Sequence, residues 1–92
     1  MYDLEYSGQF KRDLKLMAKR GLNIDEMRTV LNYLAQDGQV PASYLPHVLK
    51  DKYAGIWECH INPDWLLMYD ISESVKLVRL VRTGSHSDLF KK

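Results

Sequence analysis

The chain has 92 residues, a mass of 10.8 kDa and a formal charge of +1, from 13 Lys and Arg against 12 Asp and Glu. This length predicts one domain, residues 1–92, with a modest core. A hydrophobic content of 46 % with 27 % charged residues excludes disorder and fibrous repeats. No apolar run approaches the ~18 residues of a membrane span, and no signal peptide is evident. With Cys59 as the only cysteine, we expect a cytoplasmic domain without a disulfide or a membrane partner.

The first half of the chain predicts one strand and two helices. Residues 2–6 alternate apolar and acidic side chains, as in a strand with one buried face. Ser7 can cap a helix, because apolar side chains follow it at helical spacing. Asn23 with Glu26 three positions later resembles a capping box, which predicts a second helix that ends at Gly38.

The second half predicts three consecutive strands. After a long connection over residues 39–55, β-forming residues cover 56–61, 65–71 and 75–82, with turn residues between them. Connections this short join antiparallel strands, because a parallel crossover needs about a dozen residues or more. The order β-α-α-β-β-β predicts an α+β domain in which a two-helix hairpin packs on one face of a small antiparallel sheet. A connection as long as residues 39–55 is more often functional than idle.

The three histidines all lie in the second half of the chain, where regular structure is predicted to end or bend. His47 is in the long connection, His60 is near the end of a strand, and His86 follows the last strand. In an antiparallel meander, the end of the first strand and the end of the third meet at one edge of the sheet. This edge is therefore predicted to gather His60, His86 and two further polar residues, Asp64 and Arg82.

The direction of Arg82 is less simple. Strict alternation places it on the same side as the apolar Val78 and Leu80. A twist or a bulge near the end of this strand is therefore needed to turn Arg82 toward the histidines.

These residue types suit the cleavage of RNA, whose 2′-hydroxyl can attack the adjacent phosphorus. Histidine titrates near neutral pH, so two histidines can act as base and acid. Arg82 offers a planar set of donors to phosphoryl oxygens, and Trp65 and Phe90 can stack on bases.

Each candidate also has a purely structural interpretation. Histidines at strand ends are commonly surface residues, Asp64 follows Asn62-Pro63 as an ordinary turn residue, and Trp65 can be core packing. Zinc binding by the histidines and Asp64 is a competing chemical interpretation. It is disfavoured because no histidine pair shows a short spacing such as His-x-x-x-His, so no metal and no cofactor are predicted.

Several stretches of the sequence carry a family resemblance. They are PHVL at 46–49, GIWECHI at 55–61, PDWLLMY at 63–69 and RTGSHSDLF at 82–90, together with YSGQFKRDLK at 6–15. These stretches resemble the YafQ branch of the RelE/ParE toxin superfamily, over nearly the whole chain.

The resemblance implies a RelE-like fold and a toxin of a type II toxin–antitoxin system. It implies an endoribonuclease that inhibits translation by cleaving mRNA in the ribosomal A site, without a metal, and leaves a cyclic phosphate. It also implies a cognate antitoxin, in a heterotetramer, as inhibitor. The family's functional positions correspond to seven residues of this chain: His47, His60, Asp64, Trp65, Arg82, His86 and Phe90.

For roles, we predict His86 as the general acid toward the leaving 5′-oxygen. His60 is predicted as the base, with Asp64 close enough to orient it or to share the task. His47 is expected either to contact phosphate or to act as the base, and the sequence does not separate these roles.

The chain departs from the family pattern at Trp57, where relatives commonly have arginine. Lys50 or Lys52 can supply the phosphate contact that this arginine makes in relatives. By alternation, Trp57 shares a side with Cys59 and Ile61, so we expect it to pack toward the helices.

Two other functions remain open from the sequence. A ParE-like toxin acting on DNA gyrase shares the fold but does not require these histidines. A non-enzymatic module that only binds an antitoxin is the third possibility.

Overall fold

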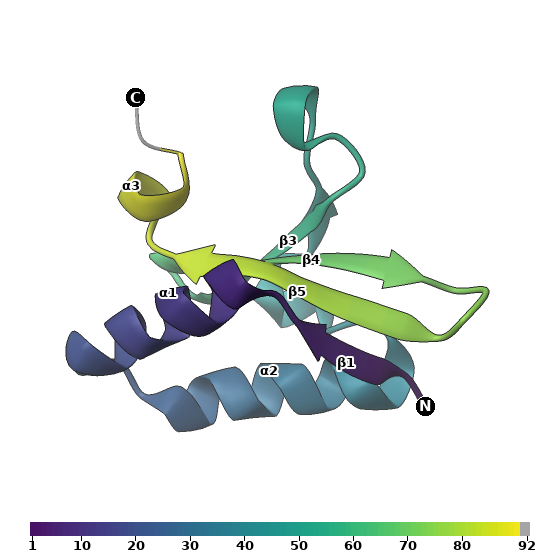
Figure 1. Cartoon of the computed structure of the whole chain (residues 1–92), viewed down its shortest axis with the longest axis horizontal. Helices are drawn as coiled ribbons and strands as arrows, with labels where there is room; N and C mark the ends of the chain where they lie inside the picture. Colours follow the sequence, from purple (N-terminus) through teal and green to yellow (C-terminus); the bar gives the residue numbers. More distant parts are fainter. Residues whose placement is uncertain (91–92) are drawn as a thin grey trace.

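The computed structural model describes residues 1–90 and shows a five-stranded sheet with two helices on one face (Figure 1). Its elements, in chain order, are β1 (Asp3–Tyr6), α1 (Gly8–Lys19), α2 (Ile24–Asp37), the 3₁₀ turn η1 (Ala42–Tyr44), β2 (His47–Val48), the 3₁₀ turn η2 (Asp51–Tyr53), β3 (Trp57–Asn62), β4 (Trp65–Ser72), β5 (Leu77–Gly84) and α3 (His86–Leu89). The predicted α+β class and the order of the main elements are confirmed. No helix of residues 1–90 combines the length and the apolar character needed to cross a membrane.

The strand order is β1-β5-β4-β3-β2. The predicted meander is confirmed, because β3, β4 and β5 pair antiparallel through short turns. The sheet is mixed rather than wholly antiparallel, because β1 pairs parallel with β5, with Leu4 opposite Val78. The turn argument constrains only consecutive strands, and α1 and α2 separate β1 from the rest of the sheet.

The expected helix boundaries follow from local capping. The Ser7 hydroxyl accepts a hydrogen bond from the Phe10 backbone N–H at 2.9 Å, and this begins α1. Asn23 caps α2 by accepting from the backbone of Asp25, without the predicted return bond from Glu26 among the described hydrogen bonds. Gly38 ends α2 in the left-handed region at φ 70°, which glycine adopts without strain.

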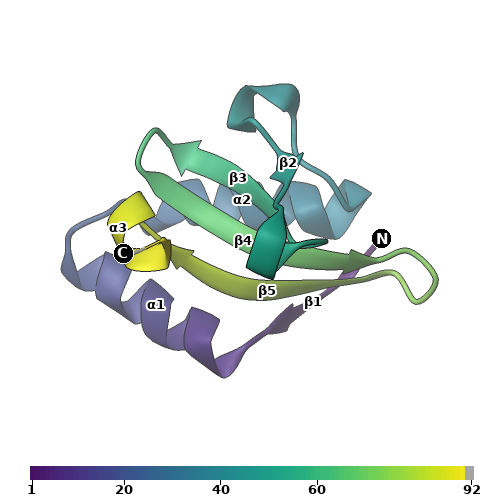
Figure 2. The same ribbon diagram turned by 90° about the horizontal axis from the view of Figure 1, so that it is seen from above.

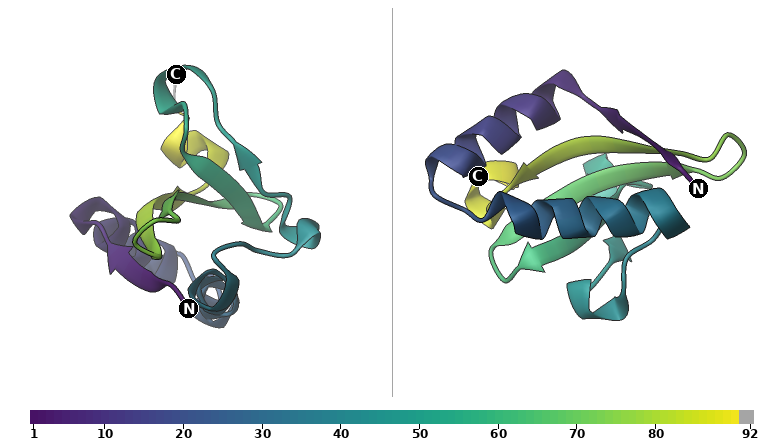
Figure 3. Two further views of the ribbon diagram at one scale, coloured as in Figure 1. Left: turned by 90° about the vertical axis from the view of Figure 1, so that its right-hand side faces the viewer. Right: turned by 90° about the horizontal axis from the view of Figure 1, so that it is seen from below.

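The main core lies between the two long helices and the sheet (Figure 3). Helical side chains such as Phe10, Met27 and Leu34 are buried there against sheet residues such as Tyr69 and Leu80. Its partly buried margin includes Trp57, as shown below, and the helices leave the other face of the sheet open.

The predicted direction of Trp57 is confirmed. Its ring packs against the main core beside Cys59 and Ile61 and stacks on Tyr69, with ring centroids 6.4 Å apart. Trp57 therefore does not occupy the face on which the histidines lie.

A smaller apolar cluster covers part of the opposite face, where Leu66 and Met68 meet Leu89 of α3 and partly buried Tyr53 and Ile56. Figure 2 shows α3 and the turn around η2 over this face. The connection over residues 39–55, predicted as irregular, contains a short strand, β2. This strand pairs antiparallel with β3 and extends the sheet.

Candidate active site

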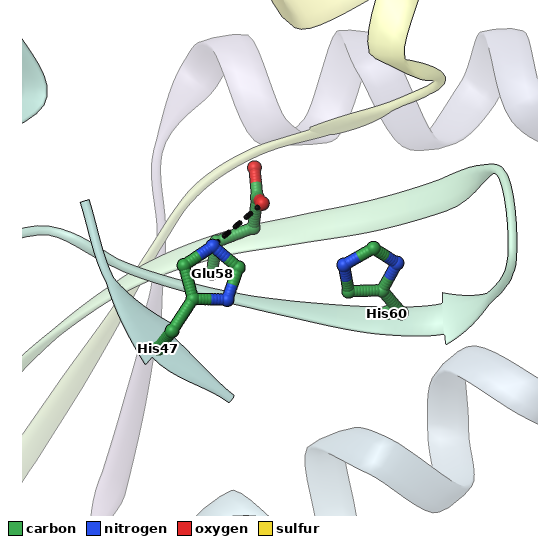
Figure 4. Close-up of side chains that lie close together, drawn as sticks. All are labelled: His47, Glu58 and His60. Carbon is green, nitrogen blue, oxygen red and sulfur yellow. Dashed lines mark ion pairs between the residues drawn. The ribbon is translucent and has the colours of Figure 1, made fainter. Parts of the chain in front are cut away.

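Cross-strand pairing shows which side chains share the open face. Glu58 lies opposite Met68, and His60 lies opposite Leu66, so both point to the side of the small apolar cluster. His47 of β2 lies opposite Glu58. The sheet itself thus brings His47, Glu58 and His60 together, as Figure 4 shows.

The three histidines form a row along this edge of the molecule. The ring centroids of His47 and His60 are 6.2 Å apart, and those of His60 and His86 are 5.9 Å apart. The predicted gathering of His60 and His86 is confirmed, and the β2–β3 pairing adds His47 to the same group.

Glu58 is a site residue that the sequence analysis did not select. It is 4 % exposed, and its Oε1 lies 3.2 Å from His47 Nε2, while its Oε2 has no hydrogen-bond partner among the described residues. The other ring nitrogen of His47, Nδ1, lies 3.1 Å from the Leu45 carbonyl oxygen. Alternation along a strand puts Glu58 on the same side as His60, but its pairing with His47 depends on β2.

Asp64 orients His86 rather than His60. Its Oδ1 accepts from the His86 backbone N–H at 3.2 Å and lies 2.8 Å from His86 Nδ1. The hydrogen bonds from His86 lower the pKa of Asp64. The prediction that Asp64 orients His60 is wrong, because the Asp64 carboxylate is hydrogen-bonded to the backbone and the ring of His86 at the start of α3.

The bulge that was predicted to turn Arg82 away from the side of Leu80 is present in β5. Tyr69 pairs with Leu80, and the next residue of β4, Met68, pairs with Arg82, so Val81 is the extra residue. Arg82 therefore shares a face with Met68, on the open side of the sheet, instead of following Leu80 toward the helices.

Asp13 of α1 holds the Arg82 side chain. The guanidinium donates from Nε at 3.0 Å and from Nη2 at 2.9 Å, and the Thr83 backbone N–H donates to the same carboxylate. Burial raises the pKa of Asp13, but the hydrogen bonds from Arg82, Gln9 and Thr83 outweigh it and leave the pKa below its ordinary value. Asp13 was not predicted, and nothing near it in sequence indicates this partner.

Trp65 lies in the main core, not in the site. Its side chain is 1 % exposed, and its indole Nε1 donates to the Thr83 hydroxyl at 2.9 Å, which in turn donates to the Leu66 carbonyl. The prediction that Trp65 stacks on RNA bases is wrong for this structure, because its ring faces the helices.

A tight corner attaches α3 to β5 and so positions His86. Ser85 and Asp88 form a capping box at the start of α3. The Asp88 carboxylate also accepts two hydrogen bonds from Arg20, at 2.6 and 2.9 Å, which ties α3 to the end of α1. A side chain at Gly84 would place a Cβ 2.8 Å from the Asp88 Cβ, so the close approach requires glycine.

We expect Asp88→Asn to lower the free energy of unfolding by about 1–2 kcal/mol at neutral pH, since it weakens a cap and a charged pair. The contacts with Arg20 and Ser85 lower the pKa of Asp88 in the folded state. Its stabilisation is therefore fully present above the unfolded pKa of about 3.9 and is lost as the pH falls below it. Urea unfolding at pH 7 and at pH 3 should show the difference from wild type shrinking by about 1 kcal/mol in acid.

The matched control is Asp25→Asn, which removes an exposed ion pair with Arg28. It should cost about 0.5 kcal/mol or less at either pH. An unchanged difference between wild type and Asp88→Asn at pH 3 would contradict the charge-based explanation.

The predicted RNA contacts lie beside the small apolar cluster. Lys50 and Lys52 flank the start of η2, and the Lys52 Nζ lies 5.4 Å from the centre of the Tyr53 ring. Tyr53 meets Phe90 edge-on with centroids 5.9 Å apart, and Phe90 is 38 % exposed. Phe90 and the turn that carries Lys52 are thus on the open face. The RNA contacts of Lys50, Lys52 and Phe90 remain predictions.

The donor set for a metal ion differs from the one that sequence spacing tested. His47, Glu58 and His60 offer one ligand atom each, and these atoms all lie within 4.8 Å of one another. Spacing along one helix could not reveal the set, because its members meet across paired strands. Cys59, between two of them, points into the main core, and burial raises the pKa of its thiol to about 12.

Comparison with known families identifies the class of this fold and site. A family model described as the bacterial toxin of the type II toxin–antitoxin system, YafQ, matches residues 2–91. The chain therefore belongs to the YafQ family of type II toxins, and the resemblance seen in the sequence is confirmed.

Three known proteins illustrate the similarity. The mRNA interferase toxin YafQ of Escherichia coli (strain B / BL21-DE3) is 38 % identical over 89 residues, which cover 96 % of this chain and 95 % of the relative. The crystal structure of the E. coli DinJ-YafQ complex contains a chain with 37 % identity and a TM-score of 0.87, with coverage of 98 % and 99 %. A metal-bound toxin from Helicobacter pylori is 38 % identical, with a TM-score of 0.88 and coverage of 98 % and 100 %.

Proposed function

We propose that this protein is a ribosome-dependent endoribonuclease that cleaves mRNA in the ribosomal A site and thereby inhibits translation. The observation that carries the proposal is the row of His47, His60 and His86 on the open face of the sheet. A ParE-like attack on gyrase does not require this row. The name mRNA interferase, borne by the E. coli relatives, supports the same activity.

The proposed reaction needs no metal. A base removes the proton of the 2′-hydroxyl, the 2′-oxygen attacks phosphorus, and the bond from phosphorus to the 5′-oxygen breaks as that oxygen is protonated. The products are a 2′,3′-cyclic phosphate and a free 5′-hydroxyl.

His86 is the proposed general acid. Its Nδ1 is engaged by Asp64, so its Nε2 is the nitrogen left for the leaving oxygen. Arg82, fixed by Asp13, is proposed to stabilise the negative charge on the phosphoryl oxygens.

His60 is the proposed base, and His47 is proposed to contact phosphate or to substitute for it. The ring of His60 lies between those of His47 and His86. Lys50 and Lys52 are proposed to bind the RNA backbone, and Phe90 to stack on a base.

The proposed partners are the ribosome, its mRNA and a cognate antitoxin, in the cytoplasm. A formal charge of +1 gives little affinity for free RNA. A ribosome that already holds the mRNA removes the need for the toxin to bind the RNA tightly by itself. The DinJ-YafQ complex supports a proteinaceous antitoxin for this chain, which we propose to form a heterotetramer with it.

The test is cleavage of an mRNA programmed in purified ribosomes. We expect a cut at the A-site codon that leaves a cyclic phosphate, that persists with a chelator of transition metals, and that disappears when the 2′-hydroxyl at the cut is replaced by hydrogen. Equal cleavage of the same mRNA without ribosomes would contradict ribosome dependence. Cleavage of the 2′-deoxy substrate would contradict the proposed nucleophile.

A further inference from the structure

We infer that Asp13 is a positioning residue of the proposed active site, and that it decides which edge of the Arg82 guanidinium meets the phosphate. Asp13 belongs to α1, which packs beside the end of β5 that carries Arg82 (Figure 1). The inference rests on the proposed function, because that function supplies the phosphate.

Asp13 occupies one edge of the guanidinium and leaves another edge free. Arg82 Nε donates to Asp13 Oδ2 at 3.0 Å, and Arg82 Nη2 donates to Asp13 Oδ1 at 2.9 Å. A guanidinium carries five N–H bonds in one plane, so two on Nη1 and one on Nη2 are left, and no residue of 1–90 accepts from them. One N–H from each terminal nitrogen forms a parallel pair, which fits two oxygens of a phosphate.

The hydrogen bonds of Asp13 show that it acts through Arg82 and not on the substrate. Its Oδ1 also accepts from Gln9 Nε2 at 2.9 Å, and its Oδ2 also accepts from the Thr83 backbone N–H at 3.2 Å. Together with the two bonds from Arg82, these fill the four acceptor sites of an ionised carboxylate. The Asp13 side chain is 7 % exposed, so it is neither a base nor a contact for RNA.

The carboxylate is itself held from two elements. Gln9 lies in the first turn of α1, and the Thr83 N–H belongs to the backbone of β5 directly after Arg82. The guanidinium is therefore fixed at both ends, by its own backbone and by Asp13, before any substrate arrives. Donors that are already oriented stabilise the charge of a transition state more than mobile ones, because no reorganisation is needed during the reaction.

Positioning and simple electrostatics predict opposite effects for Asp13→Asn. The negative charge of Asp13 repels a phosphate, so a purely electrostatic role predicts that its removal speeds cleavage. The amide keeps the shape of the side chain but loses one acceptor oxygen, so it cannot accept from both Nε and Nη2 of Arg82. Positioning therefore predicts slower cleavage, by about 10–100-fold, as for a small misplacement of a catalytic group.

Single-turnover cleavage on programmed ribosomes tests the role of Asp13, with two mRNAs that carry a normal phosphate or a phosphorothioate at the cut. Sulfur is a weaker acceptor than oxygen, so the wild-type protein should cleave the phosphorothioate more slowly. In Asp13→Asn the ratio of the two rates should move toward that of Arg82→Gln, because the misplaced donors no longer distinguish oxygen from sulfur. Partial unfolding lowers both rates equally and leaves this ratio unchanged.

The matched control is Glu5→Gln. Glu5 of β1 accepts from the Nε of Arg79 at 2.7 Å, so it also joins a carboxylate to an arginine of β5, but both side chains are half-exposed. Its cleavage rate and its substrate ratio should equal those of wild type. Asp13→Asn should add no further loss to Arg82→Gln, because the carboxylate acts only through the guanidinium.

Hydrogen exchange followed by NMR tests the fixation of Arg82 in the wild-type free protein, without any variant or any cleavage. Because its donor is held by a buried carboxylate, the Nε–H of Arg82 should exchange with water at least about tenfold more slowly than the half-exposed Nε–H of Arg79.

Equal exchange at Arg82 and Arg79 overturns the inference, even if Asp13→Asn does not fold. A folded Asp13→Asn protein that cleaves at the wild-type rate or faster also overturns it, as does a slower one with an unchanged substrate ratio. If the wild-type protein cleaves no mRNA while the Nε–H of Arg82 is protected, the proposed function fails. The role of the free guanidinium edge fails with it, whereas the fixation of Arg82 by Asp13 stands.

Discussion

Replacement of Trp65 by alanine is expected to lower the free energy of unfolding by about 3–5 kcal/mol, among the largest losses for a single side chain. The ring fills the core between the helices and the sheet, and its Nε1 donates to Thr83. For a domain of this size the Tm should fall by at least about 12 °C. Urea unfolding followed by circular dichroism measures the effect.

The control is Trp65→Phe, which keeps most of the ring but removes the donor to the Thr83 hydroxyl. It should cost about 1–2 kcal/mol, mainly from the lost hydrogen bond and a small cavity. A Trp65→Ala protein with wild-type stability and impaired cleavage would show that Trp65 acts on RNA after all.

Replacement of His86 by glutamine is expected to reduce the rate of A-site cleavage by about 10²–10⁴-fold, the usual contribution of a general acid. The His86 side chain is 55 % exposed, so the stability should change by no more than about 0.5 kcal/mol. Single-turnover cleavage on programmed ribosomes, with the unfolding curve of the same preparation, separates the two effects.

Asp64→Asn is the companion variant. The amide keeps the shape of the side chain but loses the carboxylate that engages His86 Nδ1, so the rate should fall less than in His86→Gln. The double variant should be no slower than His86→Gln alone, because Asp64 acts through the imidazole. Additive losses would mean that Asp64 has a separate role, such as the base that the sequence also left open.

The other residues predicted to contact RNA differ in how firmly the structure holds their side chains on the open face. Arg82 is fixed on the open face by a buried carboxylate, whereas Lys50, Lys52 and Phe90 lie on the exposed turns beside it.

The sequence by itself determined the two long helices, the four main strands and the edge of the sheet at which His60 and His86 meet. Turn residues at 62–64 and 72–74 leave connections too short for anything but antiparallel strands, and that geometry brings His60 and His86 to one edge. Alternation was also sufficient to place Trp57 toward the helices, because it depends only on the period of the strand.

Only the tertiary structure decided which side chains are partners within that edge. The bulge at Val81 turns Arg82 to the open face, and α1 then provides Asp13 from almost seventy positions away. The short strand β2 gives His47 a carboxylate partner in Glu58. A local pattern specifies period and direction, whereas these contacts depend on how elements distant in sequence pack, and that is settled by the core as a whole.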